Sequence, residues 1–165
     1  MKAIIVVDHG SRRQEANEMM RCVANLVQAM AGPEVLVKYA HMELAEPDVA
    51  TAFAACVEAG ADEIIVFPYM LSPGRHSTSD IPRMVAAVAV NHPQVAYSVT
   101  EAFGVHEKLA KVVLMRAGIA ARELDEQEAS RCWDPNCSAK LCGDACRAKQ
   151  KTFATATPVS AVAQS

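Results

Sequence analysis

The chain has 165 residues, a formal charge of −3 and an apolar content of 52%, with aromatic residues making up only 5%. This length is enough for one domain with an aliphatic core. The negative charge argues against non-specific nucleic-acid binding, which requires a basic surface. The N-terminal apolar stretch is too short for a signal peptide, and no run reaches the roughly 18 apolar residues that span a bilayer. We therefore expect a cytoplasmic protein that binds neither nucleic acid nor membranes.

Four short runs rich in β-branched residues are typical of buried strands in a parallel sheet. They cover residues 3–7, 35–39, 63–67 and 95–99. The segments between them have helical periodicity. From Ala16 to Met30, apolar residues recur at spacings of three and four, and Gly32-Pro33 ends the pattern. This predicts an amphipathic helix between the first two strands.

Three more helices are predicted from the same signals. Residues 49–57 form the second, with Pro47 in its first turn and Gly60 at its C-terminal cap. A third begins near Ser79 or Asp80 with Pro82 in its first turn, and a fourth covers about residues 105–116 and ends at Gly118. Cys22 and Cys56 fall on the apolar faces of the first two helices, and we expect both to be buried.

The alternation of strands and helices predicts an α/β fold. Right-handed crossovers give a four-stranded parallel sheet with helices on both faces, which is a flavodoxin-like or chelatase-like sandwich. We expect this domain to cover residues 1–121, followed by an acidic linker and a cysteine cluster over residues 122–150. The small and polar residues of 151–165 predict a disordered tail.

Three candidate metal ligands follow predicted strands. His9 lies two residues beyond the first strand, Glu43 four beyond the second and His76 nine beyond the third. A single histidine after a strand is most often a hydrogen-bonded loop residue. However, the carboxyl ends of parallel strands meet at one edge of the sheet, where ligands bind. Two imidazoles and a carboxylate suit a divalent ion such as Fe²⁺ or Co²⁺ and leave coordination positions open.

The loops that carry these residues contain longer motifs. They are His9-Gly10-Ser11-Arg12, then Met42-Glu43 followed by Ala45-Glu46-Pro47, and finally Pro68-Tyr69-Met70-Leu71, Gly74-Arg75-His76-Ser77 and Asp80-Ile81-Pro82. In this order, over about residues 1–118, the chain resembles the small, single-lobe sirohydrochlorin chelatases. The resemblance implies a class II, ATP-independent chelatase that inserts Fe²⁺ or Co²⁺ into sirohydrochlorin, for sirohaem or cobalamin biosynthesis. It also implies that His9 and His76 are the metal-handling and catalytic histidines and that Glu43 is the acidic metal ligand.

Metal insertion must remove two pyrrole N–H protons and strip water from the ion. One imidazole nitrogen cannot coordinate the ion and accept a proton at the same time. Our hypothesis is that His9 is the principal base and that His76 and Glu43 deliver the metal. Sirohydrochlorin carries eight carboxylates, for which the candidate donors are Ser11, Arg12, Arg75 and Ser77, although a single arginine is more often a solvated surface residue.

Related chelatases also occur as two fused lobes, whereas this chain shows one lobe and no internal repeat. The analogy implies a homodimer with the site between lobes. Two other functions stay open on the sequence: a non-catalytic metal or tetrapyrrole carrier, and, more weakly, a flavodoxin-like redox module. The choice between a ferrochelatase of the sirohaem pathway and a cobaltochelatase of the cobalamin pathway also stays open, with the cysteines favouring iron.

The cysteine cluster comprises Cys132, Cys137, Cys142 and Cys146. A disulfide framework is not expected in a reducing compartment. Four thiolates are the ligand number of an iron–sulfur cluster, and some chelatases of this family carry one at the C-terminus. The spacing matches no common ferredoxin pattern and lacks the Cys-x₂-Cys knuckle of structural zinc. An iron–sulfur cluster is the preferred interpretation, with zinc and uncomplexed redox thiols as the alternatives.

Overall fold

The computed structural model describes residues 1–130, so the cysteine cluster and the tail lie outside the described residues. The elements in chain order are β1 (Lys2–Asp8), α1 (Gln14–Ala31), β2 (Val35–His41), α2 (Val49–Glu58), β3 (Glu63–Pro68), the short π-helix η1 (His76–Asp80), α3 (Ile81–Ala89), β4 (Ala96–Val99), α4 (Glu107–Arg116) and α5 (Glu126–Ser130). One compact unit comprises residues 1–70 and 74–102, and the described part of a second comprises residues 71–73 and 103–130. The predicted boundary at residue 121 stays a prediction.

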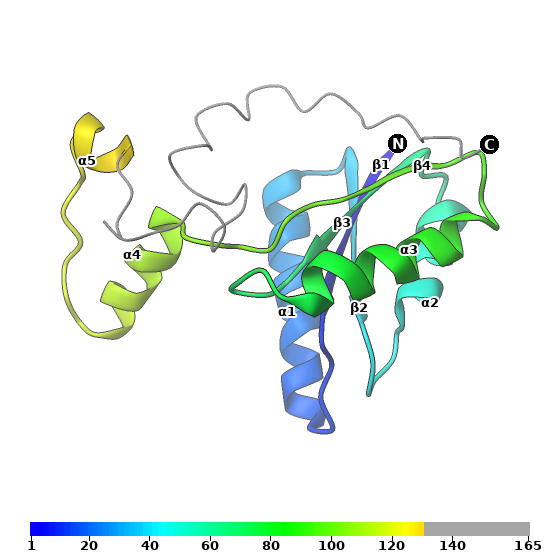
Figure 1. Cartoon of the computed structure of the whole chain (residues 1–165), viewed down its shortest axis with the longest axis horizontal. Helices are drawn as coiled ribbons and strands as arrows, with labels where there is room; N and C mark the ends of the chain where they lie inside the picture. The colour runs from blue at the N-terminus through cyan, green and yellow to red at the C-terminus, as the bar shows by residue number, and fades with distance from the viewer. Residues whose placement is uncertain (131–165) are drawn as a thin grey trace. The chain divides into compact units, whose positions relative to one another are not determined.

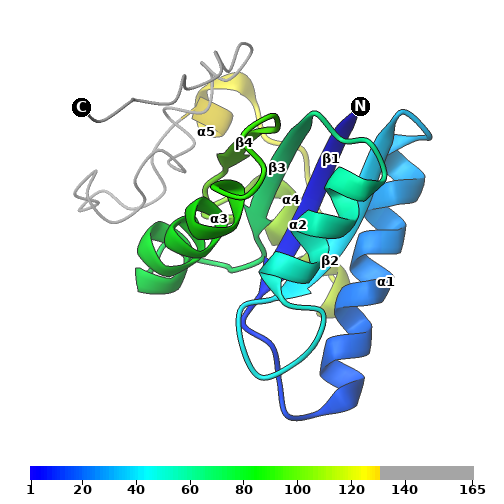
Figure 2. The same ribbon diagram turned by 90° about the vertical axis from the view of Figure 1, so that its right-hand side faces the viewer.

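The first unit contains a four-stranded sheet in the order β2-β1-β3-β4, and every pairing is parallel. Helix α1 packs on one face of this sheet, while α2 and α3 pack on the other (Figure 1; Figure 2). A parallel strand has to return to the starting edge through a crossover, and these helices are the crossovers. The predicted α/β fold with helices on both faces is confirmed.

Alternation along the strands divides the core into two layers. On β1, Ala3, Ile5 and Val7 face α2 and α3, whereas Ile4 and Val6 face α1. The larger layer also contains Phe53, Cys56, Ile64, Val66, Ile81 and Val85, all of them fully buried. Burial of one such side chain is worth about 1.5–3 kcal/mol. This aliphatic core holds the strands in register and therefore fixes where their carboxyl ends lie.

Two details differ from the sequence-based expectations. Helix α2 begins after Asp48, not with Pro47 in its first turn, because the Asp48 carboxylate caps it by accepting a hydrogen bond of 2.7 Å from the Thr51 amide. Hydrogen bonds from the backbone amide and the side chain of Thr51 keep the pKa of Asp48 below its ordinary value.

The second difference concerns the cysteines of the helices. Cys22 is exposed, so its predicted burial was wrong. Cys56 is buried as predicted, and burial raises the pKa of its thiol to about 11.

The described part of the second unit contains α4 and α5. His106 caps α4 by accepting a hydrogen bond of 3.0 Å from the Lys108 amide. The Lys111 ammonium lies 3.2 Å from Glu107 and 2.9 Å from Glu123, and the hydrogen bonds to these carboxylates raise its pKa. Within residues 1–130, none of the helices combines the length and the hydropathy needed to cross a membrane.

The pairing of β1 with β2 continues past the ends of both strands. The Met42 amide donates to the Asp8 carbonyl over 2.8 Å, and the Glu43 amide donates to the His9 carbonyl over 3.1 Å. The next residue, Gly10, has a φ of +82°, and a Cβ atom there would lie only 1.9 Å from the Glu43 carbonyl oxygen. Only glycine therefore permits the chain segment after β1 to pass this close to the segment after β2.

We predict that Gly10→Ala destabilises the fold and separates His9 from Glu43. Gly60→Ala is the matched control, because Gly60 also has a positive φ, +89°, but an added Cβ there meets nothing within 4 Å. Both variants incur the left-handed backbone cost of about 1–2 kcal/mol, and Gly10→Ala loses a further 1–3 kcal/mol or so through overpacking. Urea unfolding measures the difference. Equal losses of unfolding free energy in the two variants would contradict the proposed close approach.

Candidate metal-handling site

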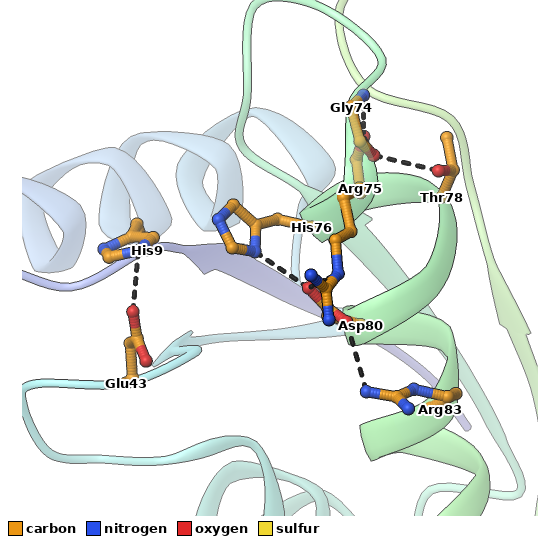
Figure 3. A network of polar contacts seen from close by, with 9 residues as sticks. His9, Glu43, Gly74, Arg75, His76, Thr78, Asp80 and Arg83 are labelled. Atoms are coloured by element: carbon orange, nitrogen blue, oxygen red, sulfur yellow. Dashed lines mark hydrogen bonds and ion pairs between the residues drawn. The ribbon is translucent and has the colours of Figure 1, made fainter.

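The three predicted ligands lie together at the carboxyl edge of the sheet (Figure 3). His9 Nε2 lies 2.8 Å from Glu43 Oε1, and the His9 and His76 rings meet edge to face with centroids 5.2 Å apart and an interplanar angle of 69°. His9 comes from the segment after β1, Glu43 from the segment after β2 and His76 from the start of η1. Their side chains are about half exposed, at 45%, 53% and 47% respectively, so a ligand from solvent can reach all three.

Each ring nitrogen of His9 has an acceptor beside it. Nε2 lies 2.8 Å from Glu43 Oε1, and Nδ1 lies 3.3 Å from the Gly10 carbonyl oxygen. A cation that binds between His9 Nε2 and Glu43 would replace any proton held there. Within residues 1–130, no three His, Cys, Asp or Glu side chains are already grouped as a metal site. The arrangement is thus an imidazole–carboxylate pair with a second imidazole beside it.

A buried histidine supports the segment that carries His9. His41, the last residue of β2, is fully buried, and its Nδ1 lies 2.6 Å from Asp8 Oδ1. The same Asp8 oxygen accepts a hydrogen bond of 3.0 Å from the Gly10 amide. Asp8 therefore connects the backbone of Gly10, the residue after His9, to His41 at the end of β2. Asp8 and His41 occupy opposite positions in the parallel register, and sequence reasoning missed this pair because the register is not readable from a local pattern.

Asn17 of α1 holds the backbone at Ser11, in the segment between β1 and α1. The Asn17 side chain accepts a hydrogen bond of 2.9 Å from the Ser11 amide and donates one of 2.8 Å to the Ser11 carbonyl. The Ser11 hydroxyl accepts from the Arg13 amide over 3.1 Å, and Arg12 is exposed beside it. Of the predicted substrate contacts, Ser11 thus has its hydroxyl engaged locally, while Arg12 faces solvent.

The loop before η1 contains the other two predicted substrate contacts. Ser77 is only 5% exposed, and its hydroxyl donates to the Gly74 carbonyl over 3.1 Å and accepts from the Gly74 amide over 3.0 Å. Arg75 has an 82% exposed side chain whose Nε lies 3.7 Å from Asp80. Ser77 therefore shapes the loop, and Arg75 presents a guanidinium to solvent next to His76.

Comparison with known proteins gives consistent matches. Residues 3–120 match the family model described as CbiX. The chain is 43% identical to the chloroplastic sirohydrochlorin ferrochelatase of Arabidopsis thaliana over 110 residues, which are 67% of this chain and 48% of that protein. It is 38% identical to the sirohydrochlorin cobaltochelatase of Methanopyrus kandleri over 85 residues, 52% of this chain and 59% of that protein.

A solved structure agrees with the sequence matches. The sirohydrochlorin chelatase SirB from Bacillus subtilis subspecies spizizenii, in complex with cobalt, superposes with a TM-score of 0.66 and 32% identity, covering 71% of this chain and 50% of that one. The chain spans about half the length of the curated relatives it matches first. Because the family match covers most of the chain, from residue 3 to residue 120, this protein belongs to the CbiX family.

Proposed function

We propose that this chain is an ATP-independent chelatase that inserts Fe²⁺ or Co²⁺ into sirohydrochlorin. The observation that carries the proposal is the His9–Glu43 pair at 2.8 Å with His76 beside it, at the edge of a parallel sheet where ligands bind. Two imidazoles and a carboxylate form a borderline donor set that suits both ions and leaves positions open for the tetrapyrrole. The names of the relatives, ferrochelatase and cobaltochelatase, support the same substrate class.

The His9–Glu43 pair suggests how one histidine can both coordinate the metal ion and accept a pyrrole proton. When the metal ion binds, any proton on His9 Nε2 passes to solvent, and Nδ1 keeps its proton beside the Gly10 carbonyl oxygen, 3.3 Å away. Nε2 of this neutral ring then coordinates the ion together with Glu43. When the ion passes to the ring centre, the Nε2 lone pair becomes free and accepts one pyrrole proton, which gives an imidazolium beside the Glu43 carboxylate. His76 accepts the second pyrrole proton on its own Nε2. Coordination and proton transfer are thus separated in time, as a single nitrogen requires.

We propose Arg12 and Arg75 as the main contacts to the substrate carboxylates, since both guanidinium groups are exposed and suit carboxylate oxygens. Ser11 and Ser77 stay proposed contacts. The Ser11 hydroxyl accepts from the Arg13 amide and can still donate its own proton to a substrate carboxylate. The Ser77 hydroxyl donates to the Gly74 carbonyl, so it has to exchange that hydrogen bond to bind the substrate.

The decisive assay is insertion of Fe²⁺ or Co²⁺ into sirohydrochlorin, followed by visible absorption. We predict more than one metallated product per protein and a loss of at least about a hundredfold in His9→Ala, because general-base catalysis contributes that much. His92→Ala is the matched control, since His92 lies between α3 and β4, at the opposite edge of the sheet. A yield that stops at one equivalent would identify a carrier. Near-normal turnover by His9→Ala, with tetrapyrrole bound, would remove His9 as the base.

We also propose a homodimer in which the site faces a second subunit. The matched part of this chain covers only 48% and 44% of the first two curated relatives, and the three proposed ligands are about half exposed in one copy of this chain. A symmetric dimer is the commonest oligomer and would provide the second wall of a tetrapyrrole cleft. Sedimentation velocity at assay concentration is predicted to give a dimer. An active monomer, with or without sirohydrochlorin, would contradict this.

The four C-terminal cysteines are proposed to hold an iron–sulfur cluster, since four thiolates are its usual ligand set. Anaerobic reconstitution is predicted to give a brown protein that contains iron and acid-labile sulfide. Cys137→Ser should lose this cluster, and Cys22→Ser, which changes an exposed cysteine of α1, should retain it. Stoichiometric zinc, or a colourless iron-free protein after reconstitution, would exclude the cluster in favour of a zinc site or free thiols.

A further inference from the structure

The carboxylate of Asp80 is next to the site and has no role in the function proposed above. We propose that Asp80, held by Arg83, is a positioning residue that keeps the proton of His76 on Nδ1 and leaves the lone pair of Nε2 available to the metal ion. The chemical consequence for metal transfer rests on the proposed function, whereas the hydrogen-bond arrangement itself does not.

Asp80 lies at the centre of a small network of polar contacts (Figure 3). Its Oδ2 lies 2.9 Å from His76 Nδ1, and its Oδ1 accepts a hydrogen bond of 3.1 Å from Arg83 Nη2. The Asp80 side chain is only 16% exposed, although those of Arg83 and Arg75 around it are largely exposed. Both oxygens are engaged, so the carboxylate has little freedom to rotate away from His76.

This contact determines which nitrogen of the ring carries the proton. The Asp80 carboxylate, ionised beside a guanidinium, can only accept a hydrogen bond, so Nδ1 of neutral His76 is the donor. The other ring nitrogen, Nε2, is then unprotonated and lies on the side of the ring that faces His9 (Figure 3). A neutral histidine without such a partner prefers the opposite tautomer, in which the Nε2 proton would block coordination.

The local backbone makes this pairing possible. In η1 the Ile81 amide donates to the His76 carbonyl, five residues earlier, which gives a wider turn than an α-helix. The start of the turn is fixed at Gly74, whose carbonyl accepts from the Thr78 amide over 2.9 Å and from the Thr78 hydroxyl over 2.9 Å. The backbone of His76 is therefore held, and Asp80 fixes the orientation of its ring.

Carboxylates that bind the outer nitrogen of a metal-ligating histidine orient the ring and increase its basicity, and their loss commonly lowers metal affinity 10–100-fold or so. The distances around Asp80 fit that role. In contrast, His9 makes its carboxylate contact through Nε2, the nitrogen that it offers to the metal. The two histidines therefore differ in their carboxylate contacts: Glu43 lies beside Nε2 of His9, whereas Asp80 lies beside Nδ1 of His76 and leaves Nε2 available.

The test uses the full chain with ¹⁵N-labelled histidine, at a pH where His76 is neutral. Long-range ¹H–¹⁵N correlation spectra are predicted to place the His76 proton on Nδ1 in the wild type and mainly on Nε2 in Asp80→Ala. Asp80→Asn is the isosteric variant, and its amide oxygen can still accept from Nδ1, so it should keep the wild-type tautomer. Asp62→Ala removes an exposed carboxylate that pairs with the N-terminus, and it should change nothing at His76.

A parallel titration with Co²⁺ alone measures metal binding without the tetrapyrrole. We expect Asp80→Ala to weaken binding 10–100-fold or so and Asp62→Ala to leave it unchanged. A wild-type His76 protonated on Nε2, or an Asp80→Ala variant with unaltered tautomer and unaltered Co²⁺ affinity, would overturn the proposal. Since neither readout involves sirohydrochlorin, a wild type that passes both tests and inserts no metal would refute the proposed function alone.

Discussion

Two backbone hydrogen bonds continue the β1–β2 pairing beyond the strands, and the geometry of the site depends on them. They place His9 and Glu43 on adjacent segments, and they require the chain at Gly10 to pass directly against the Glu43 carbonyl. Backbone pairing to a buried sheet is far more rigid than a contact between free loops, so the backbones of His9 and Glu43 are held side by side, where their side chains can meet at 2.8 Å. Leu44, with a left-handed φ of 68°, turns the chain immediately after Glu43.

This rigid pairing gives the site a particular chemical character. Glu43 lies 2.8 Å from His9 Nε2, while His9 Nδ1 faces the Gly10 carbonyl oxygen at 3.3 Å. The carboxylate therefore stands beside the ring nitrogen that is proposed to bind the metal. The network of Asp8 and His41 below the pair keeps the backbone in place, because His41 is fully buried and bound to Asp8 over 2.6 Å.

Sequence patterns predict the part of the structure that is set by local and periodic preferences. The β-branched runs identify all four strands of the sheet, and the rule that ligands gather at the carboxyl edge correctly brings His9, Glu43 and His76 together. Helical periodicity is less informative about which apolar residues face the sheet. Cys22 lies on the apolar side of α1 but is exposed, since only Met20 and Ala24 of this helix are fully covered.

Other features depend on contacts between distant residues or on competition between neighbouring signals. Pro47 and Asp48 both suit a helix start, and the side-chain hydrogen bond of Asp48 decides between them. The pairing of His41 with Asp8 follows from strand register, which no local pattern specifies. The contact between His76 and Asp80 is a spacing of four residues that sequence reasoning could have noticed, although its value depends on the wide turn of η1.

The central claim is that His9, Glu43 and His76 handle the metal substrate. Anomalous diffraction from crystals of the full chain soaked in Co²⁺, with X-ray absorption on the same complex in solution, tests it most directly. The account predicts a cobalt peak between His9 and Glu43, in place of their direct contact, coordinated by His9 Nε2, a Glu43 oxygen and His76 Nε2. Cobalt bound elsewhere, with the His9–Glu43 contact intact and no imidazole in the absorption spectrum, would contradict it.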